Sequence, residues 1–244
     1  MTKRKQESYR KLIITCICTF VALLFPYHLT AKTFEYKGNG KELANKDGRA
    51  DSMLVCQLRH KGISFSHNNS VTLLCTGQEK FDDLFKAIDQ ARSSMHLEYF
   101  NFRNDSINDE LIRHLEKKVR QGVEVRAIFD GFGNASNNQP MKKSTLRAIH
   151  KKGIEIYEFK PIEFPWIHDI FNRDHRKIVI IDGKIAYTGG MNVADYYIKG
   201  TKVVGSWHDM HCRIEGDEVN TLQNIFLRMW YLVSTKHVHG AKYY

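Results

Sequence analysis

Cysteine is scarce in this chain, and its spacing excludes the metal sites that paired cysteines build. The 244 residues include five cysteines, of which Cys16 and Cys18 lie in an apolar run near the amino terminus. The other three, Cys56, Cys75 and Cys212, are an odd number and lack the close spacing of a zinc site. Cys75 and Cys212 lie in apolar segments typical of strands, which predicts buried free thiols. We therefore predict neither a metal centre nor a disulfide.

Basic residues are abundant, but they are not interleaved with aromatic residues as in a groove that binds single-stranded nucleic acid. Lysine and arginine total 37 against 27 aspartates and glutamates, so the formal net charge is +10. Such a charge suits anionic lipid headgroups, nucleic acid or simple solubility. The missing interleaving disfavours nucleic acid as a partner.

The first 31 residues lack acidic residues except Glu7 and form either an uncleaved membrane anchor or a signal segment. The most apolar part, 12–25, has about 14 residues, which fits a signal peptide, whereas the whole uncharged run 12–31 has about 20 and could span a membrane. The poor A-x-A cleavage site before residue 32 favours an anchor. The basic flank keeps the amino terminus in the cytoplasm, so the remaining chain is expected on the exported side of the cell membrane.

After the anchor, the pattern predicts a linker over residues 32–70 and one α/β domain over residues 71–244. The linker is rich in glycine, asparagine and charge. In the domain, β-branched runs alternate with segments in which apolar residues recur with the 3.6-residue period of a helix. Strands are expected at 71–75, 95–102, 123–129, 154–157, 175–181 and near 210–214, and helices at 78–92, 107–121, 141–152 and up to about 233.

The most informative pattern is H-x-K-x4-D, formed by His175, Lys177 and Asp182. The apolar, β-branched run that starts at His175 predicts a buried strand on which His175 and Lys177 point to the same face. An imidazole beside an ammonium can attack phosphorus, because the cation offsets the negative charge of the phosphate. The pattern therefore predicts covalent chemistry on a phosphodiester, with His175 as the nucleophile.

The residues after the strand fit a phosphate site that includes Lys177. Gly189 and Gly190 have no side chains that would block the approach of a phosphate to the backbone, and Asn192 can add an amide donor. Asp182 has two interpretations, because Asp182-Gly183 between apolar runs is also a strong hairpin signal. This chemistry requires no metal and no cofactor.

The segment resembles the signature of the phospholipase D superfamily and, in detail, the amino-terminal half of bacterial cardiolipin synthases. Residues 96–105, 123–131 and 207–216 are similar to that family's strands in the same order. The resemblance implies a phospholipase D-like fold, with a mixed sheet flanked by helices. It also implies phosphatidyl transfer from a phospholipid such as phosphatidylglycerol through a phosphohistidine at His175, with Asp209 as the carboxylate that orients the imidazole.

A second H-x-K-x4-D motif is absent among the twelve histidines, although the chemistry needs a second histidine as general acid. A second copy of the chain in a homodimer, or a separate half carrying the motif, could supply that histidine. Three functions stay open. They are a phosphatidyltransferase or phospholipase D of cardiolipin-synthase type, a homodimeric phosphodiesterase or nuclease, and an inactive truncated half of a two-motif enzyme.

Aromatic residues near the motif have two interpretations. The apolar loop 161–171 either dips into a lipid interface or packs Trp166 and Phe171 against the domain. Trp207 and Trp230 are predicted to be core residues. Glu98, near the end of a predicted strand, either faces the site or is solvated.

Overall fold

The computed structural model describes residues 49–62, 66, 68–162 and 171–244. The chain divides into two units, with the division between Ser64 and Phe65. The first unit contributes helix α2 (Arg49–His60), which falls within the predicted linker. The expected anchor over residues 1–31 lies outside the described residues. Among the residues that are described, no helix has both the length and the apolar content to cross a bilayer.

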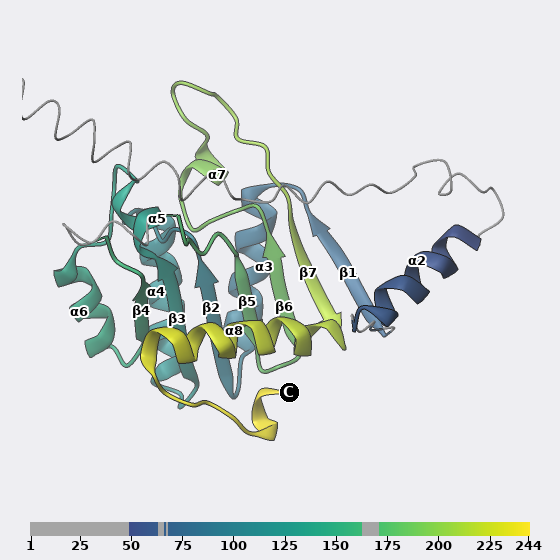
Figure 1. Cartoon of the computed structure of the whole chain (residues 1–244). Helices are drawn as coiled ribbons and strands as arrows, with labels where there is room; N and C mark the ends of the chain where they lie inside the picture. Colours follow the sequence, from purple (N-terminus) through teal and green to yellow (C-terminus); the bar gives the residue numbers. More distant parts are fainter. Residues whose placement is uncertain (1–48, 63–65, 67, 163–170) are drawn as a thin grey trace, which may run out of the picture. The chain divides into compact units, whose positions relative to one another are not determined.

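The second unit is built on one mixed sheet of seven strands, in the order β1-β7-β6-β5-β2-β3-β4 (Figure 1). The pairs β2–β3 and β3–β4 are parallel, and the other four neighbouring pairs are antiparallel. The strands are β1 (Asn69–Leu74), β2 (Ser94–Tyr99), β3 (Glu124–Asp130), β4 (Glu155–Phe159), β5 (Ile178–Ile181), β6 (Ile185–Gly189) and β7 (His211–Gly216). The predicted mixed α/β architecture is confirmed.

Helices cover both faces of this sheet. The long helix α8 crosses one face, whereas α3 and α4 lie behind the sheet in the same view (Figure 1). The helices of this unit are α3 (Gly77–Gln90), α4 (Ser106–Val119), α5 (Gly131–Ala135), α6 (Lys143–Lys151), α7 (Tyr196–Lys199), α8 (Glu218–Ser234) and the 3-10 turn η2 (Ala241–Tyr243). The predicted helices correspond to α3, α4, α6 and α8, while the short α5 and α7 were not anticipated.

Local capping explains why α3 begins where it does. The Thr76 side chain accepts a hydrogen bond from the Glu79 N–H (3.1 Å), and the Glu79 carboxylate accepts one from the Cys75 N–H (2.7 Å). These bonds satisfy backbone donors near the helix start that have no partner within the helix. They also end β1 and turn the chain towards the sheet face that α3 covers.

The alternation of side chains along β5 separates two groups of polar residues. Ile178 belongs to the apolar cluster beneath α8, and Val179 belongs to the cluster shared with α3 and α4. Because successive side chains of an extended chain point to opposite faces, Arg176 is on the α8 side and Lys177 is on the α3 side. His175 shares the side of Lys177.

Candidate active site

The site lies at one edge of the sheet. The parallel strands β2, β3 and β4 end at this edge, β6 ends there at Gly189, and β5 and β7 begin there. The predicted strand from residue 175 is shorter than expected, because β5 starts at Ile178. His175 and Lys177 therefore lie on the extended segment just before the ladder, outside the backbone pairing of the sheet.

His175 presents an accessible imidazole beside a buried ammonium. Its Nδ1 lies 3.1 Å from Lys177 Nζ, and Lys177 Nζ also donates to the His175 carbonyl oxygen (2.6 Å). The ring packs on Phe100, with centroids 4.7 Å apart and planes at 53°. Partial burial, and secondarily the charge of Lys177, lowers the pKa of His175 below its ordinary 6.5. The imidazole is therefore neutral near pH 7, which is the form that can act as a nucleophile.

Lys177 is 3% exposed, in contrast to most lysines. Its burial lowers its pKa to about 8, although the carboxylates of Asp174 and Asp209 act in the opposite direction. Its Nζ lies 5.3 Å from the centroid of the Phe100 ring, within the range of a cation–π contact. The ammonium is thus held in place by a backbone oxygen and an aromatic face.

Asp130 fixes the chain immediately before His175, and the sequence patterns did not identify it. This buried carboxylate ends β3 and accepts hydrogen bonds from the backbone N–H groups of Phe132 (2.8 Å), Gly133 (3.0 Å) and Asp174 (2.8 Å). The bond to Asp174 ties the residue next to His175 to the sheet. An aspartate at the predicted end of a strand, followed by glycine, was the available signal.

The two glycines lie close to the start of β7. A Cβ atom on Gly190 would lie 2.0 Å from Asp209 Oδ1, and one on Gly189 would lie 2.7 Å from His211 Nδ1. The Gly190 N–H donates to the Met210 carbonyl oxygen (2.9 Å) and is not available to a phosphate. The Asp209 side chain, just before β7, fills the space next to Gly190, so the approach of a phosphate to these glycines stays a prediction. Their small size allows Asp209 to approach the backbone.

Asp209 lies close to two buried lysines. Its charge raises the pKa values of Lys177 and Lys80, opposing the effect of their burial. Its Oδ1 accepts a hydrogen bond from the Met210 N–H (2.7 Å). Among the described residues, the His175 ring has its hydrogen-bond contact with Lys177. The contact between Asp209 and His175 implied by the family resemblance therefore stays a prediction.

Asn192 is mostly committed to the scaffold. Its side-chain oxygen accepts the Asn101 N–H (3.2 Å), and its amide nitrogen donates to the Tyr197 hydroxyl (3.3 Å). Its carbonyl oxygen accepts a hydrogen bond from Lys80 Nζ (3.2 Å). The Asn192 side chain also hydrogen-bonds the Tyr196 hydroxyl, so its predicted role as a donor to the phosphate stays a prediction.

Asp182 lies at the opposite edge of the sheet from His175. Seven residues of extended chain separate the two, which corresponds to about 23 Å. The Asp182 carboxylate accepts the backbone N–H groups of Arg92 (2.8 Å), Ser93 (2.7 Å) and Ser94 (3.0 Å). Asp182 and Gly183 both have positive φ, of 54° and 64°, in the turn between β5 and β6. The geometry supports the turn interpretation of Asp182 and leaves it out of reach of a substrate at His175.

Two fully buried residues beneath the site escaped the sequence predictions. Lys80 and His211 are both 0% exposed, and neither nitrogen of the His211 ring has a hydrogen-bond partner among the described residues. Burial, with the nearby charges of Lys80 and Lys177, lowers the pKa of His211 to about 2. His211 is therefore a neutral neighbour of two lysines. Lys80 occupies an apolar stripe of α3, which was a usable signal.

A second polar group lies on the α8 side of the same segment. Arg176 Nε lies 2.7 Å from Glu98 Oε1 and 2.9 Å from Asp174 Oδ1. Burial and the adjacent Asp174 carboxyl raise the pKa of Glu98 to about 9. Glu98 therefore carries a proton at pH 7, and the interpretation of Glu98 as a solvated residue is wrong.

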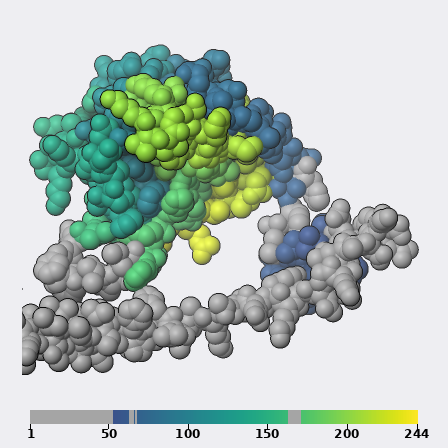
Figure 2. Space-filling view, turned by 90° about the horizontal axis from the view of Figure 1, so that it is seen from above, coloured from purple at the N-terminus to yellow at the C-terminus, as the bar shows by residue number. Residues whose placement is uncertain are grey.

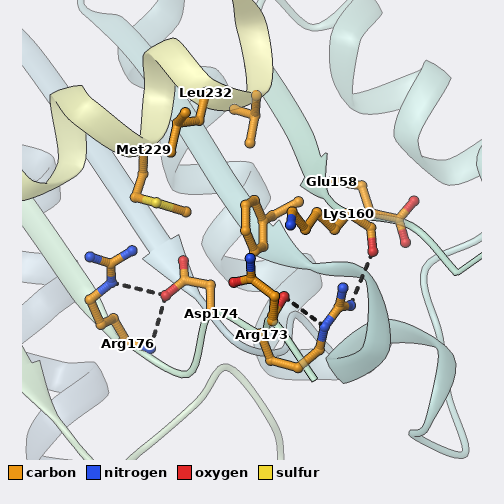
Figure 3. A pocket seen from close by; sticks show the side chains of 10 residues that line it. Glu158, Lys160, Arg173, Asp174, Arg176, Met229 and Leu232 are labelled. Atoms are coloured by element: carbon orange, nitrogen blue, oxygen red, sulfur yellow. Dashed lines mark hydrogen bonds and ion pairs between the residues drawn. The ribbon is translucent and has the colours of Figure 1, made fainter. Parts of the chain in front are cut away.

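Asp174 and Arg176 line a cavity of about 510 Å³ between α8 and the end of β4 (Figure 3). Figure 3 shows the Arg176 guanidinium bonded to the Asp174 carboxylate, with Met229 and Leu232 of α8 above them. This cavity faces away from His175 and Lys177. The other residues that line it are Glu158, Phe159, Lys160, Asn172, Arg173 and Val233.

Three further predictions concern the cysteines, metal binding and the loop 161–171. The described cysteines are free thiols, but Cys75 is exposed and Cys212 is half-buried, so the prediction that both are buried is wrong. In the described part of the chain, no group of three or more potential ligands could hold a metal ion. Residues 163–170, with Trp166, lie outside the described residues, whereas Phe171 is 76% exposed.

Comparison with known proteins identifies similar sequences and a similar structure. A family model described as "Cardiolipin synthase, PLD-like domain" matches residues 84–230. Cardiolipin synthase 2 of Staphylococcus epidermidis is 37% identical over 201 residues, which are 82% of this chain and 39% of that protein. Cardiolipin synthase of Halalkalibacterium halodurans is 38% identical over 178 residues, which are 72% and 34% of the two chains. This chain therefore spans less than two fifths of the length of these curated relatives.

Among solved structures, phosphatidylserine synthase of Haemophilus influenzae aligns with a TM-score of 0.52 at 13% identity. The alignment covers 63% of this chain and 35% of that one. At this level of identity, the similarity shows a shared fold.

Proposed function

The chain belongs to the phospholipase D-like cardiolipin synthase family, and from this premise we propose that it transfers phosphatidyl groups between phosphatidylglycerol-type lipids. The observation that carries the proposal is the pairing of the accessible His175 imidazole with the buried Lys177 ammonium, 3.1 Å apart. A neutral imidazole with a fixed cation beside it suits attack on a phosphodiester.

The proposed reaction has two displacement steps at phosphorus. In the first, Nε2 of His175 forms a bond to the lipid phosphorus, and the bond to the headgroup oxygen breaks. Glycerol leaves after its oxygen receives a proton. In the second, the hydroxyl of another phosphatidylglycerol attacks, the phosphorus–nitrogen bond breaks, and cardiolipin forms. Water as the acceptor would give phosphatidic acid instead.

Attack through Nε2 requires the proton of the neutral ring to be on Nδ1. In the structure Nδ1 faces the Lys177 ammonium, which can donate a hydrogen bond but cannot accept one. We therefore infer that the ring turns when substrate binds, so that a carboxylate takes the Nδ1–H bond and stabilises the imidazolium. Asp209 is our candidate, because it lies near Lys177 and is held against Gly190.

Lys177 would neutralise the charge on the phosphate, and the side-chain amide of Asn192 would add a donor by exchanging a tyrosine hydroxyl for a phosphate oxygen. Because the chain contains one H-x-K-x4-D motif, a second histidine is needed as the general acid for the leaving glycerol. We propose that a second copy of the chain, or a separate half with its own motif, supplies it. Residues 1–31 would hold the domain at the exported side of the cell membrane.

A homodimeric phosphodiesterase that cleaves nucleic acid is the second candidate, favoured by the single motif and the net charge of +10. An inactive half of a two-motif enzyme is the third. The test is to incubate the full chain in detergent with phosphatidylglycerol and to measure cardiolipin and glycerol. We expect both products, a phosphatidyl group trapped on His175, and no turnover by His175→Ala.

The mass of the protein in the same detergent, taken together with its lipid and nuclease activities, separates the three candidates. Lipid turnover by a dimer supports the proposal. Nuclease activity without lipid turnover selects the second candidate, and a strict monomer without either activity selects the third.

A further inference from the structure

A closed hairpin tip projects between α7 and β7, formed by residues 201–205. The Thr201 N–H donates to the Gly205 carbonyl oxygen and the Gly205 N–H donates to that of Thr201, each at 2.8 Å. The Thr201 hydroxyl also accepts the Val204 N–H (3.0 Å). Gly205 has a φ of +76°, which a glycine adopts without strain. The tip therefore has a defined turn conformation.

Two adjacent apolar side chains occupy this tip. Val203 is 94% exposed and Val204 is 63% exposed. Val203 is the most exposed of the large apolar side chains that the structure describes. Scattered exposed valines need no explanation, but an adjacent pair at the end of a projecting turn contributes nothing to the core. Exposure of these apolar side chains to water is unfavourable in free energy, and burial against a partner surface would remove that cost.

The base of the hairpin is held by aromatic packing. The ring of Trp207 lies 4.8 Å from the ring of Tyr196 and 6.1 Å from that of Tyr197, measured between centroids. Trp207 is 37% exposed, so the prediction that it is a core residue is wrong, whereas Trp230 is fully buried as predicted. The Trp207 contacts connect the tip to α7 and restrict its direction relative to the sheet.

The tip lies at the same edge of the sheet as His175. The segment that carries it leaves the site after Asn192 and returns to it at Asp209, the residue held against Gly190. Figure 1 shows this segment rising above α7, and Figure 2, which looks down on the same edge, shows it in yellow-green towards the viewer. A surface that the tip contacts would therefore face the edge that holds the candidate nucleophile.

Charge indicates what kind of surface the tip fits. Residues 199–208 include Lys199 and Lys202 but no acidic residue. Lys199 is paired with Asp195 (2.6 Å), which leaves the segment cationic at Lys202. Two tips that met on a two-fold axis would bring their Lys202 side chains together, so a second copy does not suit this tip, wherever else it contacts the chain. An anionic lipid surface would instead attract the lysines and accept the valines.

We propose that the hairpin tip inserts Val203 and Val204 into the interface of an anionic phospholipid bilayer. Insertion to a depth of about 5–10 Å is typical of interfacial apolar groups. It would place the His175 edge at the level of the lipid headgroups. The proposal rests on the lipid chemistry proposed above, and it names the element that presents the site to its substrate.

A fluorescent probe at residue 203 of the full chain tests the insertion directly. Val203→Cys is combined with Cys56→Ser and Cys75→Ser, labelled with an environment-sensitive dye, and mixed with phosphatidylglycerol vesicles. We expect a blue shift and quenching by lipids brominated in their acyl chains, beyond the background of the protein without Val203→Cys. Emission unchanged from buffer would overturn the proposal, as would a shift without vesicles that grows with protein concentration and so indicates a second copy.

A kinetic comparison provides the second arm. For Val203→Ser/Val204→Ser we expect turnover of phosphatidylglycerol in vesicles to fall about tenfold, with turnover of a monomeric short-chain phosphatidylglycerol unchanged. The control is Val71→Ser/Leu73→Ser, which alters two side chains of β1 that are each 57% exposed, and should change neither rate. An equal fall with both substrates would count against insertion. If wild-type protein turns over neither substrate, the proposed function fails, and the probe still decides insertion.

Discussion

Lys177 Nζ lies 3.1 Å from Nδ1 of His175 and 2.6 Å from the carbonyl oxygen of the same residue. Two residues of one extended segment thus place a cation beside an accessible imidazole. The backbone before them is fixed by Asp130, which accepts the Asp174 N–H at 2.8 Å. The pair therefore has a defined position before any substrate binds.

Replacing Lys177 by methionine should reduce kcat/KM by roughly 10²–10³, because one preorganised charge at the phosphate is lost. Methionine keeps the unbranched apolar stem of the lysine and removes the buried ammonium, so the stability of the fold should change little. The measurement is phosphatidyl transfer in detergent, with thermal unfolding as the check on folding. Full activity in Lys177→Met would show that the ammonium does not act on the phosphate.

The pH profile of kcat/KM should be bell-shaped. Activity requires neutral His175, so it falls as the pH drops through the lowered pKa of that residue, below about 6.5. Activity also requires charged Lys177, so it falls as the pH rises through about 8. Lys177→Arg provides the control, since a guanidinium stays charged to above pH 12. The kcat/KM that remains in this variant should no longer fall as the pH rises through about 8. If it falls as in wild type, Lys177 is not the cause of the decrease.

Gly190 and Asp209 should be coupled in stability. Gly190→Ala places a methyl group 2.0 Å from the present position of Asp209 Oδ1, which should cost about 1–3 kcal/mol in the free energy of unfolding. Asp209→Ala removes the obstructing atoms, so the double variant should regain most of that loss. Urea unfolding of the four proteins measures the coupling, and additive effects would contradict it.

Most strands and helices of the fold could be predicted from local sequence patterns. The β-branched runs and the 3.6-residue apolar periods located six of the seven strands and four helices, because each of those elements buries one face or is buried on both. The short α5 was not predictable in this way. It exists because Asp130 caps it through the N–H groups of Phe132 and Gly133, and five residues are too few for a period to show.

The candidate site was predictable only where its chemistry follows from residue spacing. His175 and Lys177 were identified because the two side chains must be adjacent to act together. Lys80 and His211 come from α3 and β7, and no spacing along the chain indicates that they meet beneath Lys177. The contact between Gly190 and Asp209 was not predictable either, because the two residues are distant in sequence and meet only through the pairing of β6 with β7.

Replacing Asp182 tests whether this residue of the H-x-K-x4-D motif contributes to activity or only to the stability of the fold. Asp182→Ala leaves the N–H groups of Arg92, Ser93 and Ser94 without an acceptor, which should reduce the free energy of unfolding by roughly 2–4 kcal/mol. Activity per folded molecule should be unchanged, because the residue lies at the far edge of the sheet. Chemical denaturation and phosphatidyl transfer measure the two effects. A folded variant without activity would show that Asp182 is needed for catalysis.

Glu98 should make the stability of the domain depend on pH. Its pKa in the folded state is raised from 4.5 to about 9, first by burial and then by Asp174. The folded state therefore binds a proton that the unfolded state releases above pH 4.5, and the stabilisation from this group is lost as the pH rises towards 9. The slope has an upper limit of about 1.4 kcal/mol per pH unit.

Glu98→Gln keeps the shape of the protonated carboxyl and cannot ionise. Compared with wild type, the variant should therefore become steadily more stable as the pH is raised from 5 to 8, as measured by urea unfolding at each pH. Glu110→Gln is the matched control, because the Glu110 side chain on α4 is 43% exposed, and it should show no such trend. Parallel stability curves for Glu98→Gln and wild type would mean that Glu98 is already ionised in the folded protein. Arg176, 2.7 Å away, would then be its counter-ion, in a salt bridge between a buried carboxylate and an exposed guanidinium.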